Sequence, residues 1–256
     1  MNPENDKAWV GPEAFAPTSM PLHRLPLPAQ GSIHLWYLDL GRLGGSLKQV
    51  LAGETPPSGT EEPDPGLLRF TRRFYLRLLL GAYLDIPGKD VVINRSNRGK
   101  PVLDAAVHDS ELKFSMAKSE NRVLIGISAL HHVGVDLEPA GRKARNALRL
   151  AERYFSAAEF NTLKALGPER LDQAFLRAWA LNEAVVKASG LGIANQLCRF
   201  TLQMDPDLPP AMLAIEGDQA ANWSLALVRP SSDFIGAVAS RQPRMDITCF
   251  QLLPAS

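Results

Sequence analysis

Hydrophobic residues in this chain follow two periods, and the first is the period of β-strands. Apolar or alternating runs of strand length occupy residues 33–40, 122–128 and 133–138. Weaker runs of the same kind predict further strands at residues 90–94, 111–116, 199–204, 222–229, 233–239 and 246–252.

The second period is that of α-helices. Apolar positions at helical spacing predict long helices at residues 67–84 and 168–190. The second segment begins at Pro168, which suits a first helical turn, and ends at Gly190, which suits a C-terminal cap. Shorter helices are predicted at residues 144–154 and 157–165.

The order strand, helix, strands occurs twice along the chain. We therefore predict an α+β protein of two halves, an N-terminal half at residues 31–130 and a C-terminal half at residues 131–256. Residues 1–30 are rich in proline and polar side chains, which predicts a loosely ordered leader. A proline-rich loop is predicted at residues 53–66.

Composition and charge narrow the class of protein. Hydrophobic residues make up 45% of the chain, enough for a sizeable core, and the formal net charge of +1 favours neither nucleic acid nor membrane. No segment has the apolar length of a signal peptide or a membrane span. Cys198 and Cys249 form no CxxC pair. We expect reduced thiols and a cytoplasmic protein.

Two carboxylates lie two residues apart on the predicted strand 133–138. Because side chains alternate along a strand, Asp136 and Glu138 share one face, whereas Val133, Val135 and Leu137 point into a core. Neighbouring carboxylates repel each other unless water or a hard cation such as Mg²⁺ lies between them. A solvent-facing strand edge is the alternative, and for an isolated pair it is the commoner case.

A second charged pair lies on the predicted helix 168–190. Glu183 and Lys187 are four residues apart and therefore neighbours on one helix face. A surface ion pair is the ordinary interpretation of this spacing. The functional interpretation makes Glu183 a third metal carboxylate and Lys187 a partner for phosphate.

Other common site motifs are missing from the sequence. The chain has no P-loop, no GxGxxG, no GxSxG and no HExxH motif. His131 and His132 are adjacent and would point to opposite faces of a strand, so we do not expect them to bind one metal together.

Five sequence blocks in order resemble the Sfp-like group of the 4′-phosphopantetheinyl transferase superfamily. The first signature block is VGVDLEP at residues 133–139. The second is residues 179–187, which resemble the family pattern W-x-x-K-E-x-x-x-K. Between them, residues 153–159 resemble the RFF-S-x-x-E segment. Upstream, residues 99–101 resemble the GKP turn, and residues 114–119 lie where the family has F-N-x-S-H-S.

This resemblance implies a fold, an activity and partners. The fold is a pseudo-twofold pair of α+β halves with coenzyme A in the cleft between them. The activity transfers the phosphopantetheine arm of coenzyme A to a serine of an acyl or peptidyl carrier protein and releases adenosine 3′,5′-bisphosphate. One chain then supplies both halves, so we expect a monomer.

The resemblance also implies roles for individual residues. Asp136, Glu138 and Glu183 would bind Mg²⁺, and Glu183 or a water it holds would act as the base. Lys187 would contact the pyrophosphate. The nucleotide phosphates would be contacted by Lys100, Lys118 and an arginine of the helix 67–84, Arg69 or Arg73.

The chain departs from the family pattern near these residues. Asn182 replaces the lysine before the glutamate, Ser115 replaces the asparagine, and Ala117-Lys118 replaces Ser-His. These changes make a second interpretation possible, in which the chain is a non-catalytic homologue that binds coenzyme A and acts as a regulator or scaffold.

A basic segment follows the first signature block. Residues 141–153 carry Arg142, Lys143, Arg145 and Arg149 among alanines and leucines. The carrier proteins of this class are acidic around the modified serine, so we expect this segment to form the docking surface. A solvated helix face is the alternative.

Overall fold

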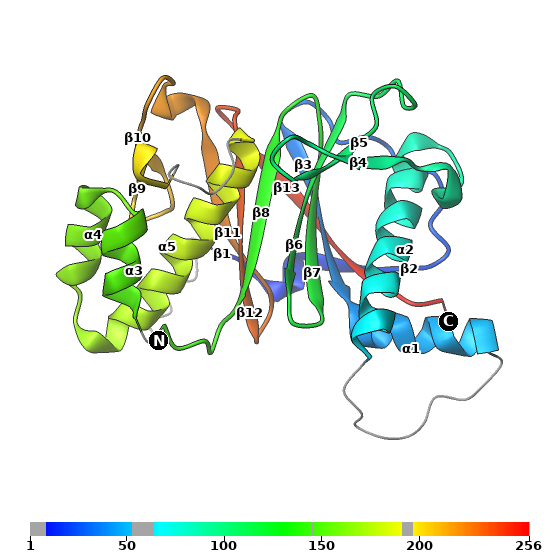
Figure 1. Ribbon diagram of the computed structural model, residues 1–256, viewed down its shortest axis with the longest axis horizontal. Coiled ribbons are helices and arrows are strands. Elements are labelled where there is room, and N and C mark those ends of the chain that lie inside the picture. The colour runs from blue at the N-terminus through cyan, green and yellow to red at the C-terminus, as the bar shows by residue number, and fades with distance from the viewer. Residues whose placement is uncertain (1–8, 53–63, 145, 191–196, 256) are drawn as a thin grey trace.

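Two β-sheets lie back to back at the centre of the molecule, and each carries helices on its outer face. The computed structural model describes residues 9–52, 64–144, 146–190 and 197–255 (Figure 1). The layers run helices, sheet, sheet, helices. The prediction of an α+β fold is therefore confirmed. Within the described residues, no helix is long and apolar enough to cross a membrane.

The first sheet has the strand order β2-β13-β3-β7-β6. Helix α2 covers its outer face and packs Tyr75, Leu76 and Leu79 against it. The elements of this half are β3 (Ser32–Asp39), α1 (Leu40–Ala52), α2 (Pro65–Leu84), β4 (Ile93–Arg95), β5 (Pro101–Leu103), β6 (Leu112–Ser119) and β7 (Arg122–Ala129).

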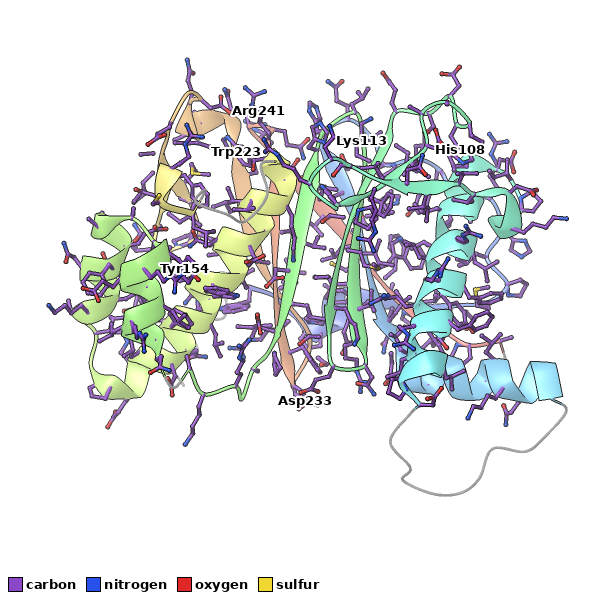
Figure 2. All side chains as sticks on the ribbon, in the orientation of Figure 1. His108, Lys113, Tyr154, Trp223, Asp233 and Arg241 are labelled. Carbon is purple, nitrogen blue, oxygen red and sulfur yellow. The ribbon has the colours of Figure 1, made fainter. Side chains whose placement is uncertain are left out.

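The second sheet has the strand order β1-β11-β12-β8, and helix α5 covers its outer face. In Figure 2, Asp233 marks the turn of the β11–β12 hairpin, and Trp223 and Arg241 mark its open end. The elements of this half are β8 (Val133–Pro139), α3 (Ala147–Tyr154), α4 (Ala157–Lys164), α5 (Pro168–Ser189), β9 (Phe200–Leu202), β10 (Met212–Ile215), β11 (Ser224–Ser231) and β12 (Phe234–Ser240).

The two halves repeat one order of elements, which gives the pseudo-twofold fold. Strand β3 corresponds to β8, helix α2 to α5, and the small pair β4–β5 to β9–β10. The hairpin β6–β7 then corresponds to the hairpin β11–β12. In the first half β7 pairs antiparallel with β3, and in the second half β12 pairs antiparallel with β8.

The ends of the chain differ from the predicted division at residues 1–30, 31–130 and 131–256. Of the leader, β1 (Trp9–Val10) pairs with β11 in the second sheet, and β2 (Phe15–Ser19) pairs with β13 in the first. Strand β13 (Asp246–Leu253), from the C-terminal end, lies parallel to β3 in the first sheet. The polar composition of residues 1–30 does not reveal these strands, because their backbone pairing and the burial of Phe15 depend on contacts with distant segments.

Helix α1 has no counterpart in the predictions. Its sequence contains Gly41, Gly44 and Gly45, which lower helix propensity and hide the apolar stripe. The helix forms because tertiary packing outweighs propensity. Leu40, Leu43 and Leu47 are buried in the core under α2.

Helix α5 touches the backbone of β8, and Gly134 makes this approach possible. A Cβ at this position would lie 1.9 Å from the carbonyl oxygen of Ala184 and 2.4 Å from the amide nitrogen of Ala188. Residues 134, 136 and 138 share one face of β8, so the same contact places α5 directly over Asp136 and Glu138.

We predict that Gly134→Ala destabilises the protein by about 2–4 kcal/mol, because α5 must move outward to admit the methyl group. Chemical unfolding followed by circular dichroism measures the change. Gly45→Ala is the matched control, since nothing lies within 4 Å of its added Cβ. The control should be neutral or stabilising by up to about 1 kcal/mol. Equal stability of the two variants would contradict the close contact.

Candidate active site

Three carboxylates lie at the contact between β8 and α5. Asp136 and Glu138 come from β8 and Glu183 from α5, and all three residues are at most 9% exposed. The alternative of a solvent-facing strand edge is therefore wrong for Asp136 and Glu138, because α5 covers them.

Lys187 lies among these carboxylates. Its Nζ donates a hydrogen bond to Asp136 Oδ1 at 2.6 Å and lies 4.0 Å from Glu183 Oε2. The Lys187 side chain is only 26% exposed. The Glu183–Lys187 pair is therefore part of a half-buried charged cluster, and the ordinary interpretation as a surface ion pair is wrong.

Glu138 has a different cationic partner. Arg142 Nη1 donates to Glu138 Oε2 at 2.7 Å. Because Arg142 lies just beyond the end of β8 and Lys187 lies on α5, the two carboxylates of β8 are held from opposite sides.

Burial and the repulsion between neighbouring carboxylates raise the pKa values of Glu138 and Glu183. Burial is the largest cause that raises the pKa of Glu183; the positive charge of Lys187 opposes it, and Asp136 and Glu138 add to it. Burial also raises the pKa of Glu138, and the hydrogen bond from Arg142 opposes the shift. The cluster therefore holds more negative charge than its two cations neutralise.

The donor atoms of the cluster suit a hard cation such as Mg²⁺. All three side chains offer carboxylate oxygens, and Asp136 Oδ2 is buried without a hydrogen-bond partner among the described residues. Across the same residues, no three acidic, imidazole or thiol side chains converge as a finished metal site. Lys187 and Arg142 hold two of the three carboxylates, so a cation would have to displace them in part.

The Gly99-Lys100-Pro101 turn lies against the end of α5. Lys100 Nζ donates to the backbone carbonyl of Lys187 at 2.7 Å and to that of Val133 at 2.9 Å. Burial, and then the charge of Lys187, lowers the pKa of Lys100 from 10.5 to about 8. Lys100 thus joins the two halves through α5 and β8. Its predicted contact with nucleotide phosphate stays a prediction.

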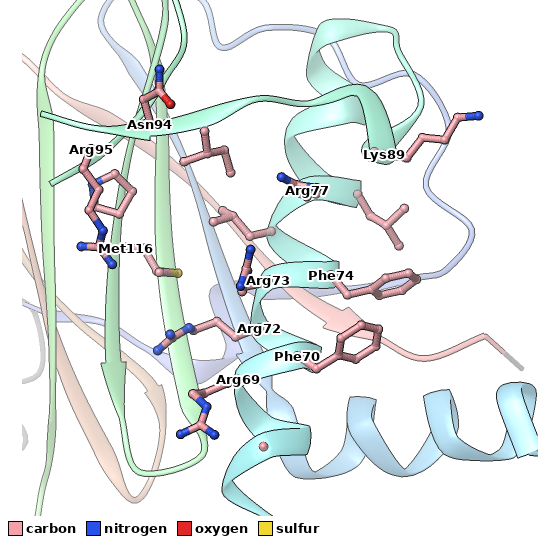
Figure 3. A pocket seen from close by; sticks show the side chains of 16 residues that line it. Arg69, Phe70, Arg72, Arg73, Phe74, Arg77, Lys89, Asn94, Arg95 and Met116 are labelled. Carbon is pink, nitrogen blue, oxygen red and sulfur yellow. The ribbon is translucent and has the colours of Figure 1, made fainter. Parts of the chain in front are cut away.

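A cavity of about 1030 Å³ lies between α2, the β4–β5 pair and Met116 of β6 (Figure 3). Arginine side chains dominate one side of it, and none of them pairs with a carboxylate among the described residues. These residues are Arg69, Arg72, Arg73, Arg77 and Arg95. Phe70 and Phe74 also line the cavity, and Figure 3 shows them on the side of α2 away from Arg72 and Arg95.

Arg72 and Arg95 were not among the predicted site residues. Arg72 is half-buried, its Nε has no hydrogen-bond partner among the described residues, and burial, then Arg95 and its neighbours on α2, lower its pKa. Five neighbouring arginines that pair with no carboxylate among the described residues are a strong indication of an anion-binding site. Sequence alone could not choose among arginines on one helix, because only the fold brings α2 and β4 to the two sides of one cavity.

Lys118 is exposed on β6. By strand alternation it shares a face with Met116, which lines the arginine cavity. The replaced residues Ser115 and Ala117 point the other way. Ser115 Oγ accepts a hydrogen bond from the Val135 amide at 3.2 Å, and Ala117 is buried between the two sheets. Ser115 thus ties the edge strand β6 to the edge strand β8.

Asn182 is fully buried and points away from the carboxylates. Its Nδ2 donates to the carbonyl oxygen of Ala178 at 2.9 Å and lies 3.4 Å from Glu159 Oε1. Glu159 also accepts hydrogen bonds from the amides of Ser156 and Leu202, at 2.8 and 3.1 Å. The missing lysine of the family pattern would therefore have faced Glu159 in the core of α4, α5 and β9.

The predicted docking segment lies partly on the surface. Arg142, Lys143 and Arg149 are exposed, whereas Arg145 lies outside the described residues. Helix α3, which carries Arg149, ends at Tyr154, which is labelled in Figure 2. The Tyr154 ring meets Trp179 of α5 edge to face, with ring centroids 6.2 Å apart. The basic segment is therefore anchored on the helix that carries Glu183 and Lys187.

Comparisons with known proteins agree with this fold. Residues 132–239 match the family model of the 4′-phosphopantetheinyl transferase superfamily. The chain is 29% identical over 212 residues to the 4′-phosphopantetheinyl transferase HetI of Nostoc sp., covering 81% of this chain and 86% of the relative.

More distant matches have the same transferase in their names. Identity is 25% over 186 residues to the human L-aminoadipate-semialdehyde dehydrogenase-phosphopantetheinyl transferase, covering 67% of this chain and 60% of the relative. It is 28% over 118 residues to the 4′-phosphopantetheinyl transferase gsp of Aneurinibacillus migulanus, covering 46% of each. Residues 132–239 of the chain are thus similar to the 4′-phosphopantetheinyl transferase superfamily, and the relatives that the chain matches are named as 4′-phosphopantetheinyl transferases.

We predict that Lys100 makes the stability of the protein depend on pH above pH 8. Its pKa falls from 10.5 in the unfolded chain to about 8 in the folded one, so the folded state gains stability as pH rises through this window and loses it as pH falls. Between pH 8 and 10 the wild type should gain about 2 kcal/mol relative to Lys100→Gln.

Urea unfolding at both pH values measures this difference. Lys89→Gln is the control, because Lys89 is exposed and its removal should leave the pH dependence unchanged. Parallel pH profiles of wild type and Lys100→Gln would contradict the burial of a charged amine at this position.

Proposed function

We propose that this protein transfers the 4′-phosphopantetheine arm of coenzyme A to a serine of an acyl or peptidyl carrier protein, with Mg²⁺ as cofactor and adenosine 3′,5′-bisphosphate as the product released. The observation that carries the proposal is the buried set of Asp136, Glu138 and Glu183 with Lys187 among them. Acids and a lysine at one buried contact suit the transfer of a charged phosphoryl group.

The arginine cavity is the proposed site for the nucleotide phosphates. Its guanidinium groups form no ion pair with a carboxylate in the described part of the chain and offer the positive charge that a polyphosphate needs. Pro101 lines this cavity, and the preceding Lys100 is bonded to the end of α5. A coenzyme with its nucleotide in the cavity would therefore direct its pyrophosphate across β6 and β8 toward Lys187.

The chemistry assigns a task to each side chain. Asp136, Glu138 and Glu183 would hold Mg²⁺, which when bound offsets the negative charge that develops on the phosphoryl oxygens. Lys187 orients the pyrophosphate. Glu183, or a water it holds, accepts the serine proton while the serine oxygen bonds to the pantetheine-side phosphorus and the bond to the nucleotide breaks. Burial raises the pKa of Glu183, which makes its carboxylate a stronger proton acceptor.

The carrier protein would dock on the exposed cations of the segment after β8. Arg142, Lys143 and Arg149 offer positive charge beside the carboxylate cluster, and an acidic carrier is complementary to it. All proposed groups come from one chain, which supports action as a monomer. Cys249 is buried and forms no disulfide among the described residues, which supports a reducing, cytoplasmic setting.

The alternative of a non-catalytic homologue rested on the departures from the family pattern. Asn182 and Ala117 are both buried and point away from the carboxylate cluster. Both departures therefore leave Asp136, Glu138 and Glu183 in place, which favours the enzyme.

The direct test incubates the protein with coenzyme A, Mg²⁺ and an apo carrier protein, followed by intact mass spectrometry of the carrier. Wild type should add one phosphopantetheine. Glu183→Gln should slow the transfer by at least about a hundredfold, because it removes a metal ligand and the base, while its circular dichroism spectrum stays unchanged. Normal turnover by this variant would contradict the assigned role of Glu183.

A second prediction concerns the cavity. Arg72→Ala should raise the KM for coenzyme A by about tenfold, because a half-buried charge-assisted contact to phosphate is lost. The KM for the carrier should stay unchanged. Arg24→Ala is the control, since Arg24 is exposed and pairs with Asp85 outside the cavity. An unchanged KM for coenzyme A in Arg72→Ala would place the nucleotide elsewhere.

A further inference from the structure

We propose that Arg142 is a gate that couples docking of an acidic partner to metal binding at Glu138. This inference rests on the proposed function and adds a regulatory role for a residue of the docking segment. In the free protein, Arg142 holds Glu138. An acidic side chain of the docked carrier takes over the guanidinium and leaves Glu138 available to the cation.

The first support is the geometry of the ion pair. Arg142 Nη1 lies 2.7 Å from Glu138 Oε2, a charge-assisted hydrogen bond of full strength. A turn holds the arginine in place, because its amide donates to the carbonyl oxygen of Pro139 at 3.1 Å. The preceding Ala140 amide is bonded to Asp233 of the β11–β12 turn at 2.8 Å. The chain therefore folds back over the end of β8 and returns Arg142 to a residue four positions earlier.

The second support is the difference in exposure between the two partners. The Glu138 side chain is 12% exposed, whereas that of Arg142 is 57% exposed. One end of the pair is thus inside the carboxylate cluster, and the other can be reached from solution by a second protein. Lys187 differs in this respect, because it lies on α5 with a side chain only 26% exposed.

The third support is the position of Arg142 among its neighbours. Lys143, Arg149 and Arg153 follow it along the same segment and are exposed, so an acidic surface that meets them also meets Arg142. Of the two cations that hold carboxylates in the cluster, only Arg142 belongs to this segment. Docking of a carrier would therefore affect the carboxylate cluster through Arg142.

Arg142 and the divalent cation compete for the Glu138 carboxylate, and this competition determines whether docking strengthens or weakens metal binding. A guanidinium on Glu138 Oε2 takes one acceptor oxygen and offsets the negative charge that this carboxylate offers a divalent cation, so whatever removes Arg142 strengthens metal binding. By linkage, bound metal strengthens partner binding by the same factor. The metal site would then be completed most fully when a carrier is present to be modified.

Isothermal titration with Mg²⁺ on chelator-treated full-length protein tests the competition. Arg142→Gln should bind Mg²⁺ about three- to fivefold more tightly than wild type, the factor expected for a partly exposed ion pair. Arg170→Gln is the matched control, because Arg170 Nη2 also lies 2.7 Å from a carboxylate oxygen, Asp207 Oδ2. Arg170 is in the first turn of α5, whereas Glu183 and Lys187 are near the other end of the helix. The Mg²⁺ affinity of Arg170→Gln should equal that of wild type. Unchanged or weaker binding by Arg142→Gln would overturn the gate.

A second titration tests the coupling to the partner. An acidic apo acyl carrier protein at saturating concentration should tighten Mg²⁺ binding to wild type and to Arg170→Gln. In Arg142→Gln the same addition should have a smaller effect, because Glu138 is already free. An equal effect in all three proteins, or no effect in any, would overturn the coupling.

The two proposals fail in different ways. Transfer by wild type with equal Mg²⁺ affinities of wild type and Arg142→Gln would remove the gate and keep the proposed function. Absence of both Mg²⁺ binding and transfer in wild type would remove the proposed function and the gate with it.

Discussion

The backbone contact between α5 and β8 is the constraint on which the site depends. At Gly134 the helix lies so close that a methyl group would overlap the Ala184 carbonyl. Only this approach brings Glu183 and Lys187 of the helix onto the face of the strand that carries Asp136 and Glu138. The acids are then buried together, and their repulsion is offset by Lys187 and Arg142.

The pseudo-twofold fold determines what can reach this cluster. Strands β6 and β8 are edge strands of the two sheets, and Ser115 joins them through the Val135 amide. The arginine cavity lies on one side of this junction and the carboxylates on the other, with Lys100 bonded between them. The two ends of the chain connect the sheets: β1 belongs to the second sheet, whereas β2 and β13 belong to the first. The relative position of the cavity and the carboxylate cluster therefore depends on the whole chain.

Sequence reasoning found the parts of the site that local patterns specify. Alternation put Asp136 and Glu138 on one face, and Pro168 and Gly190 marked the ends of the helix that carries Glu183. The parts that it missed depend on contacts between distant segments. Arg72 and Arg95 face each other only because the fold places α2 and β4 on two sides of one cavity. Helix α1 forms in spite of its glycines because α2 covers it.

The same limit explains the ambiguous pairs. Spacing alone favoured a solvated edge for Asp136 and Glu138, since no local pattern reveals that a helix from some fifty residues later covers them.

The proposed function depends most on whether Asp136, Glu138 and Glu183 together hold a divalent cation. Anomalous X-ray scattering from crystals grown with Mn²⁺ and coenzyme A tests it most directly. A manganese peak bounded by the three carboxylates is expected; a peak elsewhere, with Lys187 and Arg142 still on Asp136 and Glu138, would contradict it.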